Sequence, residues 1–78
     1  YNMTPEIQKV TISDDYITLG QFLKLTKTIS YGGEEKAFLA INTVLVNDEK
    51  EIRRGRKLRH GDIVNISNHL YQICSLKN

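Results

Sequence analysis

The spacing of hydrophobic residues changes along the chain and divides it into segments of different predicted secondary structure. Residues 7–12 mix apolar and polar positions among good strand formers, which predicts a short strand at the edge of a sheet. From Thr18 onward the apolar positions recur every three or four residues, and Gln21 follows Thr18 at the spacing of a capping box. A helix is therefore predicted to begin near Thr18. Its buried stripe comprises Leu19, Phe22, Leu23, Thr26 and Ile29.

A second helix is predicted from Glu34 to Asn42. Gly32 and Gly33 before it form a stop-and-turn signal, and acidic residues suit the first turn of a helix because its free amides carry partial positive charge. The predicted buried stripe of this helix contains Ala37, Phe38 and Ile41. Because the link between the helices is short, we expect them to pack as neighbours joined by a tight turn.

The remainder of the chain has the spacing of strands. Residues 43–46 predict a strand that ends at the turn pair Asn47-Asp48, and residues 63–67 and 70–74 predict a hairpin around Asn68-His69. The predicted fold class is α+β, with two packed helices against a small, mainly antiparallel sheet. The whole chain, residues 1–78, is expected to form one domain.

Composition narrows the classes of function. With 40% hydrophobic residues and a net charge of +2, the 78 residues suit a folded domain with one modest core and leave little room for a deep active site. No apolar run approaches the roughly 20 residues that a membrane span needs, and the first ten residues lack the apolar block of a signal peptide. A single Cys74 permits no internal disulfide. We therefore expect a cytoplasmic protein with neither a membrane partner nor a small-molecule substrate.

The positive charge is concentrated in residues 50–59, which hold six basic residues against one acid and so carry +5. The other 68 residues carry −3. A dense basic run attracts polyanions, because binding releases the counterions condensed on them. Four of the six bases are Arg, whose planar group matches phosphate oxygens, and Gly55 would let the backbone approach a ligand closely. The segment is predicted to bind a polyanion.

The helix pair, followed by residues 42–48 and closed by residues 58–64, resembles the alpha-L RNA-binding domain named after ribosomal small-subunit protein four, the S-four domain. The family pattern there is Gly-x-Val-x-Val-Asn-Gly and then Gly-Asp-x-Val; this chain has Asn42 and Asp48 at the two outer Gly positions. The resemblance extends over about residues 17–66, with the predicted strands 7–12 and 70–74 on either side. The small stand-alone bacterial YaaA-type proteins are more similar still, on residues 17–24, 32–33, 44–47 and 53–58.

This resemblance implies binding of structured RNA, with ribosomal RNA or a ribosome-assembly intermediate as the expected partner. Many S-four domains open helix one with Arg and helix two with Ser-Arg, but Thr18 and residues 33–35 stand in those places here. Those contacts are not carried over, and Glu34 and Glu35 are expected to point away from the RNA. The predicted RNA-binding residues are Lys24, Lys27, Gly32, Gly33, Lys36, Asn47, Arg53, Arg54, Gly55, Arg56, Lys57 and Arg59. Replacing Arg53, Arg54 and Arg56 together by Ala is predicted to weaken RNA binding and leave the fold intact.

The sequence predicts no enzyme, no cofactor and no metal site. His60, His69 and Cys74 match no zinc-ligand spacing, and Asp62 in a Gly-Asp turn is expected to bind backbone amides. Tyr31 has two open roles, stacking on a base or covering the end of the helix pair.

Two other functions are compatible with a basic loop on a small domain. A protein-interaction adaptor, whose basic loop binds an acidic protein surface, is the main alternative. A duplex-DNA binder is disfavoured, because no helix carries a basic face long enough to enter a major groove.

Overall fold

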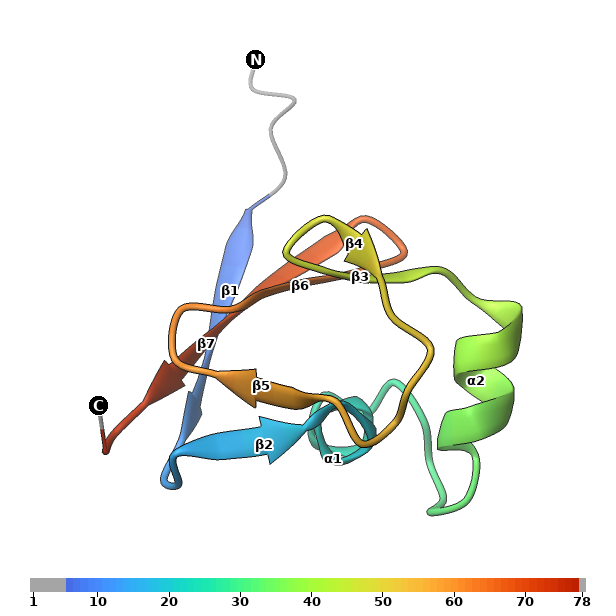
Figure 1. The fold of residues 1–78 in the computed structure, drawn as a ribbon, viewed down its shortest axis with the longest axis horizontal. Coiled ribbons are helices and arrows are strands. Elements are labelled where there is room, and N and C mark those ends of the chain that lie inside the picture. Colours follow the sequence, from blue (N-terminus) through green and yellow to red (C-terminus); the bar gives the residue numbers. More distant parts are fainter. Residues whose placement is uncertain (1–5, 78) are drawn as a thin grey trace.

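A computed structural model describes residues 6–77; residues 1–5 and 78 of the predicted domain lie outside the described residues. The chain forms an α+β fold of short elements (Figure 1). In chain order these are β1 (Ile7–Ile12), β2 (Tyr16–Thr18), α1 (Leu19–Leu25), α2 (Glu35–Ile41), β3 (Val44–Val46), β4 (Glu49–Lys50), β5 (Lys57–Arg59), β6 (Ile63–Ile66) and β7 (His69–Ser75). Neither helix in this described part is long and apolar enough to cross a membrane.

The strands form one five-stranded mixed sheet and one two-stranded ribbon. The larger sheet has the order β1-β7-β6-β3-β4, in which β1 pairs parallel with β7 and every other pair is antiparallel. The ribbon consists of antiparallel β2 and β5, and β2 leads directly into α1 in Figure 1. The mainly antiparallel pairing and the edge position of β1 are thus as predicted. Strands β2, β4 and β5 were not predicted, and β5 occupies the end of the expected basic loop.

Both hairpins of the larger sheet turn through residues with positive φ. Asn47 and Asp48 have φ of 52° and 70°, and Ser67 and Asn68 have φ of 49° and 69°. Two successive left-handed residues match the right-handed twist of the flanking strands. The second turn lies one residue earlier than predicted, because His69 already pairs with Ile66 as the first residue of β7.

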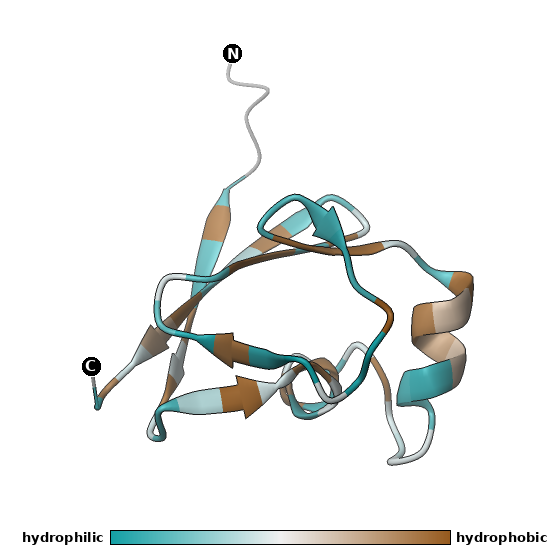
Figure 2. Cartoon of the chain, in the orientation of Figure 1, coloured by the Kyte–Doolittle hydropathy of each residue, from teal (hydrophilic) through white to brown (hydrophobic). Residues whose placement is uncertain are grey.

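The core lies between α1 and the larger sheet. Leu19, Phe22 and Leu23 are fully buried, as the predicted stripe requires. They belong to the same cluster as apolar strand residues, which give the brown bands along β3 and in the middle of β5 in Figure 2. The Phe22 ring meets the Tyr71 ring edge to face, with centroids 5.3 Å apart. This packing fixes α1 against the sheet.

Helix α1 begins as predicted but ends early. The capping box is complete, since the Thr18 Oγ1 accepts a hydrogen bond from the Gln21 N–H and the Gln21 Oε1 accepts one from the Thr18 N–H. The helix stops at Leu25, and Lys27 has a positive φ of 60°. Ile29 is therefore buried from the connecting segment, and Lys27 does not share a helical face with Lys24.

Helix α2 buries a different face from the predicted one. Its buried residues are Glu35 and Leu39, one helical turn apart, whereas Ala37 is exposed, Phe38 is half-buried and Ile41 is 82% exposed. A seven-residue helix can bury only one narrow face, formed by residues one turn apart. In α2 the first residue of that buried face is the acidic Glu35. Residues 26–34 connect the helices, a longer link than the expected tight turn, and α2 stands apart from α1 in Figure 1.

Candidate nucleic-acid interface

The basic segment, residues 50–59, is fixed to the N-terminus of α1. The Leu19 N–H donates to the Arg56 carbonyl and the Gly20 N–H donates to the Arg54 carbonyl, each at 2.8 Å. The first amides of a helix have no partner within the helix, so these carbonyls satisfy donors that would otherwise need water or a side chain. The middle of the segment is therefore held by these bonds to α1, and its two ends are held by strands β4 and β5.

Gly20 makes this close approach possible. A Cβ atom at position 20 would lie 3.1 Å from the Glu35 Cγ and 3.3 Å from the Arg54 carbonyl oxygen. Both distances are tighter than ordinary van der Waals contact, so a larger residue would push the basic segment or Glu35 away. Gly55 differs, because a Cβ there would meet nothing within 4 Å.

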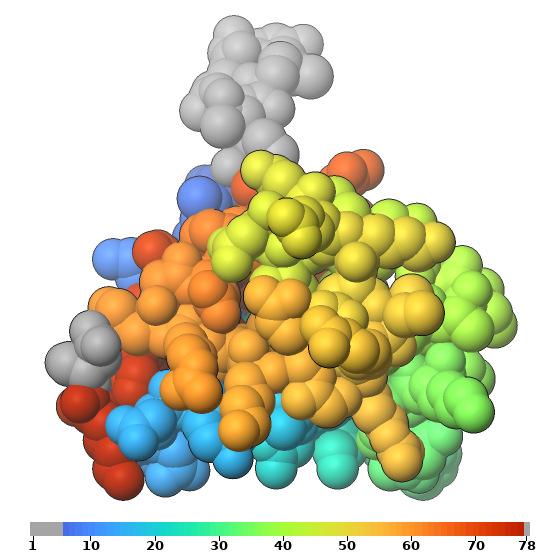
Figure 3. Space-filling model, in the orientation of Figure 1, coloured from blue at the N-terminus to red at the C-terminus, as the bar shows by residue number. Residues whose placement is uncertain are grey.

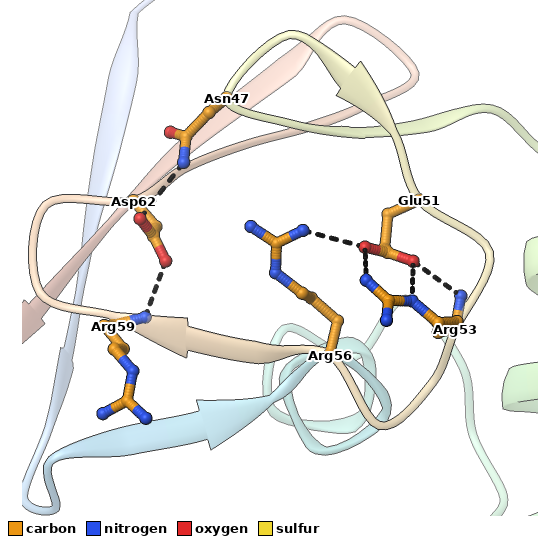
Figure 4. A network of polar contacts seen from close by, with 6 residues as sticks. All are labelled: Asn47, Glu51, Arg53, Arg56, Arg59 and Asp62. Carbon is orange, nitrogen blue, oxygen red and sulfur yellow. Dashed lines mark hydrogen bonds and ion pairs between the residues drawn. The ribbon is translucent and has the colours of Figure 1, made fainter.

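A buried carboxylate, Glu51, organises the interior of the basic segment. It accepts hydrogen bonds from the Arg53 N–H (3.0 Å), Arg53 Nε (3.0 Å), Arg53 Nη2 (3.2 Å) and Arg56 Nη1 (2.9 Å), as Figure 4 shows. The hydrogen bond from the Arg53 side chain is the largest influence on the Glu51 pKa. It outweighs the effect of burial and, with the other bonds, lowers that pKa from 4.5 to about 2.

Two of the predicted RNA-binding arginines are thus occupied within the protein. Arg53 and Arg56 both form salt bridges to Glu51, and the Arg56 guanidinium points into the loop in Figure 4. Ion pairing also raises the pKa of Arg53, through its hydrogen bonds to Glu51. The expectation that Ala at positions 53, 54 and 56 leaves the fold intact does not fit this geometry, because it strips both partners from a buried charge.

Other basic side chains of the segment face outward. Arg54 is exposed and lines an open depression with Lys24 and Gly55, while Gly55, Arg56 and Lys57 line the adjacent one with Arg53. In Figure 3 the yellow and orange atoms of this segment cover much of the face in view. The structure therefore brings together six of the predicted residues, namely Lys24, Arg53, Arg54, Gly55, Arg56 and Lys57.

Glu35 also lies at this surface, contrary to expectation. Its carboxylate accepts the Gly33 N–H at 3.1 Å from each oxygen and sits 4.0 Å from the Arg54 Nη1. Glu34 instead accepts the Tyr31 N–H at 2.7 Å. Glu35 is buried because it bonds the turn before α2, and it places one negative charge beside Arg54.

An aromatic residue joins the outward cations on the β2–β5 ribbon. Leu58 is buried, so Lys57 and Arg59 on either side of it project outward. Tyr16 pairs with Arg59 across the ribbon; its ring centroid lies 4.8 Å from the Lys57 Nζ and 5.4 Å from the Arg59 Cζ. No motif in the sequence marks Tyr16. The alternation of polar and apolar residues at 57–59 could have indicated the strand β5. Its pairing with β2, which brings Tyr16 to these cations, is a long-range contact that the alternation does not reveal.

The remaining candidates lie elsewhere or serve the fold. Lys27 and Lys36 are exposed, and Gly32 borders Lys24, since a Cβ at Gly32 would be 4.0 Å from the Lys24 Nζ. Gly33 has a φ of 95°, a backbone conformation that residues other than glycine rarely adopt, and it therefore serves the turn before α2. Tyr31 is 74% exposed, so it does not cover the end of a helix pair.

Asn47 shapes a turn instead of facing the outward cations. Its Oδ1 accepts the Ile63 N–H at 3.0 Å. Its Nδ2 donates to the Asp62 carboxylate at 3.1 Å, as seen in Figure 4. Asp62 in turn accepts the Arg59 N–H at 2.7 Å, which confirms its predicted bond to a backbone amide. Within residues 6–77 no three His, Cys, Asp or Glu side chains are grouped so that they could hold a metal ion.

Comparison with known proteins places the chain in a family. The model of the S4 domain family matches residues 10–74. A relative from Bacillus subtilis (strain 168), which carries the name "Probable ribosome maturation protein RlbA", is 56% identical over 57 residues, covering 73% of this chain and 80% of the relative. No solved structure matches. The chain belongs to the S4 domain family.

Proposed function

We propose that this protein is a non-catalytic RNA-binding module that docks on structured RNA, either ribosomal RNA or a ribosome-assembly intermediate. Membership of the S4 domain family and the relative named as a ribosome maturation protein support this proposal. The observation that carries it is the row of outward cations Arg54, Lys57 and Arg59 on a segment anchored to α1. Lys24 extends this row onto the helix.

The arrangement suits recognition of RNA shape. A-form RNA exposes phosphates and 2′-hydroxyls and hides its major groove, so a small rigid module can bind it through placed cations without a recognition helix. Because Arg53 and Arg56 are already bonded to Glu51, we count the outward cations Lys24, Arg54, Lys57 and Arg59 as the phosphate contacts. About four neutralised phosphates should then set the slope of log affinity against log salt concentration.

Filter binding across a salt series tests the proposal. The purified protein is titrated with a structured RNA, a DNA duplex of equal length and heparin. Preference for the RNA that persists at physiological salt is the expected result. Equal binding to all three that disappears together as salt rises would reduce the segment to a general polyanion patch and contradict the proposal.

A protein-interaction adaptor is the second candidate, and two exposed apolar side chains favour it. Ile41 on α2 and Ile52 in the basic segment are both largely exposed, and Ile52, which adjoins Arg53 in the sequence, would offer a protein partner an apolar contact within the basic segment. An acidic protein partner lacks the condensed counterions of nucleic acid, so its binding would depend less steeply on salt. The same salt series therefore separates the two functions.

A further inference from the structure

A groove runs along α1 beside the outward cations, on the side of the connection between β1 and β2. Its volume is about 550 Å³ and it is open to solvent. The helix contributes one wall and the start of the ribbon contributes the other. The lining residues that matter for its chemistry are Asp14, Tyr16, Ile17, Gln21, Lys24 and Leu25.

The groove exposes apolar surface where solvent-facing helix residues are usually polar. Leu25 is 53% exposed and Tyr16 is 39% exposed, and the partly buried Ile17 lies beside them. Lys57 and Arg59 lie against the Tyr16 ring, so a flat ligand in the groove would stack on the ring surface that these cations leave free. The walls therefore suit a planar group with an apolar face.

Asp14 distinguishes the groove from the cationic depressions, which contain no aspartate, although Lys24 also lines it. The Asp14 carboxylate repels anions, while it can accept a hydrogen bond from the N–H groups at the edge of a base. The Gln21 Oε1 is engaged by the Thr18 N–H, so the Gln21 amide nitrogen is the group that can donate to a ligand. A neutral, flat ligand with donors and acceptors at its rim fits this chemistry.

The groove is continuous with the cationic surface. Tyr16 lines the groove and also lies beside the Lys57 and Arg59 side chains. Lys24 lines both the groove and the depression that contains Arg54 and Gly55. A nucleic-acid strand with its phosphates on these cations would therefore have a base within reach of the groove.

We propose that this groove takes one unpaired base of the RNA, stacked on Tyr16, beside a helix held by the basic segment. This inference rests on the proposed function and narrows its ligand to structured RNA with an unpaired nucleotide next to a helix. The stacking of one base on an aromatic side chain is worth about tenfold in affinity.

Three matched RNA hairpins test the groove: one fully paired, one with a single bulged nucleotide, and one in which that nucleotide is abasic. We expect the bulged hairpin to bind about tenfold more tightly than the abasic one, and Tyr16→Phe to keep this difference. Tyr16→Ala should abolish the difference, while Tyr31→Ala should preserve it. Leu25→Glu alters an exposed groove residue without touching the core and should also abolish it.

The chain contains no Trp, so Tyr16→Trp provides a single fluorophore in the groove. Its emission should be quenched by the bulged hairpin and not by the abasic one. Equal affinity of the wild-type protein for these two hairpins would overturn the inference, as would a base preference that survives Tyr16→Ala and Leu25→Glu. Absence of binding to all three hairpins would instead contradict the proposed function itself.

Discussion

Four cations of the basic segment divide into two pairs with different surroundings. Arg53 and Arg56 (the inner pair) both bind the buried Glu51, although the Arg53 side chain itself is 72% exposed, whereas Arg54 and Lys57 (the outer pair) make no bond to Glu51 and line two adjoining depressions. The pairs are close in sequence and equal in charge, so the count of six basic residues overstates how many are free of an internal partner. The comparison shows that part of a basic run can serve as the internal frame that presents the rest.

The inner pair should carry the largest effect on stability. Replacing Arg53 and Arg56 together by Ala leaves the Glu51 carboxylate buried without its cations. After allowance for solvent screening around the exposed Arg53, we expect the free energy of unfolding to fall by roughly 1–3 kcal/mol and the melting temperature by roughly 5–20 °C. Thermal unfolding followed by circular dichroism measures this. The matched control is the double variant Arg54→Ala with Lys57→Ala, and equal melting temperatures for the two doubles would remove the distinction.

The outer pair should carry the largest effect on RNA affinity. Arg54→Ala with Lys57→Ala should lower affinity for a structured RNA on the order of tenfold or more at low salt and flatten the salt slope by about two, because two phosphate contacts are lost. Filter binding across the salt series reports both quantities. Lys9→Ala with Lys77→Ala removes the same charge from exposed positions away from the depressions. If this control lost as much affinity, net charge and not placement would explain binding.

The pH dependence of stability should separately reveal the contribution of the ion pairs of Glu51 with Arg53 and Arg56. The pKa of Glu51 is about 2 in the folded protein and 4.5 when unperturbed. Its contribution to stability is therefore complete above about pH 4.5 and is lost as the pH falls from there towards 2. After allowance for solvent screening around the exposed Arg53, we expect this contribution to be roughly 1–3 kcal/mol.

Urea unfolding of the wild type and of Glu51→Gln at pH 6 and pH 3 measures the contribution. The stability difference between the two proteins should narrow at the lower pH. Glu49→Gln, which changes an exposed acid on β4, serves as the control and should differ little from the wild type at either pH. A Glu51→Gln difference that stays constant with pH would refute a stabilising role for the ion pairs of Glu51 with Arg53 and Arg56.

The smallest expected effects on stability come from two glycines, one at the contact between α1 and the basic segment and one within that segment. Gly20→Ala crowds the Arg54 carbonyl and Glu35 and should cost about 1 kcal/mol net of its better helix propensity. Gly55→Ala meets open space and should leave the melting temperature nearly unchanged. If backbone approach at Gly55 matters for RNA, this second variant should still lower affinity. Similar melting temperatures for the two variants would mean that the segment is not seated tightly on α1.

Local chemistry explains what the sequence predicted well. The capping box at Thr18 and Gln21, the stripe of α1 and the turn at Asn47-Asp48 depend on neighbours within a few residues, so spacing alone reveals them. The basic run was likewise visible from composition. None of these features places the basic segment at the start of α1, because that placement depends on the long-range hydrogen bonds from the Leu19 and Gly20 N–H groups.

Long-range contacts explain what the sequence did not predict. Glu51 was counted only as one acid among bases, because its burial depends on how Arg53 and Arg56 fold around it. Tyr16 acquires its cationic neighbours only through pairing of β2 with β5. The buried face of α2 follows from bonds between Glu35 and the preceding turn, which outweigh the hydrophobicity of Ile41. Each of these contacts depends on polar or aromatic side chains, and the spacing of hydrophobic residues along the chain does not predict such contacts.

Arginine side-chain NMR tests the division of the basic segment most directly. The Nε–H signals of Arg53, Arg54 and Arg59 are followed while a structured RNA hairpin is added to the wild-type protein. We predict that the Arg54 and Arg59 signals shift and that the Arg53 signal stays, because its Nε remains bonded to Glu51 at 3.0 Å. An Arg53 signal that moves as far as that of Arg54 would show that RNA takes Arg53 from Glu51 and would contradict the separation of frame from contact surface.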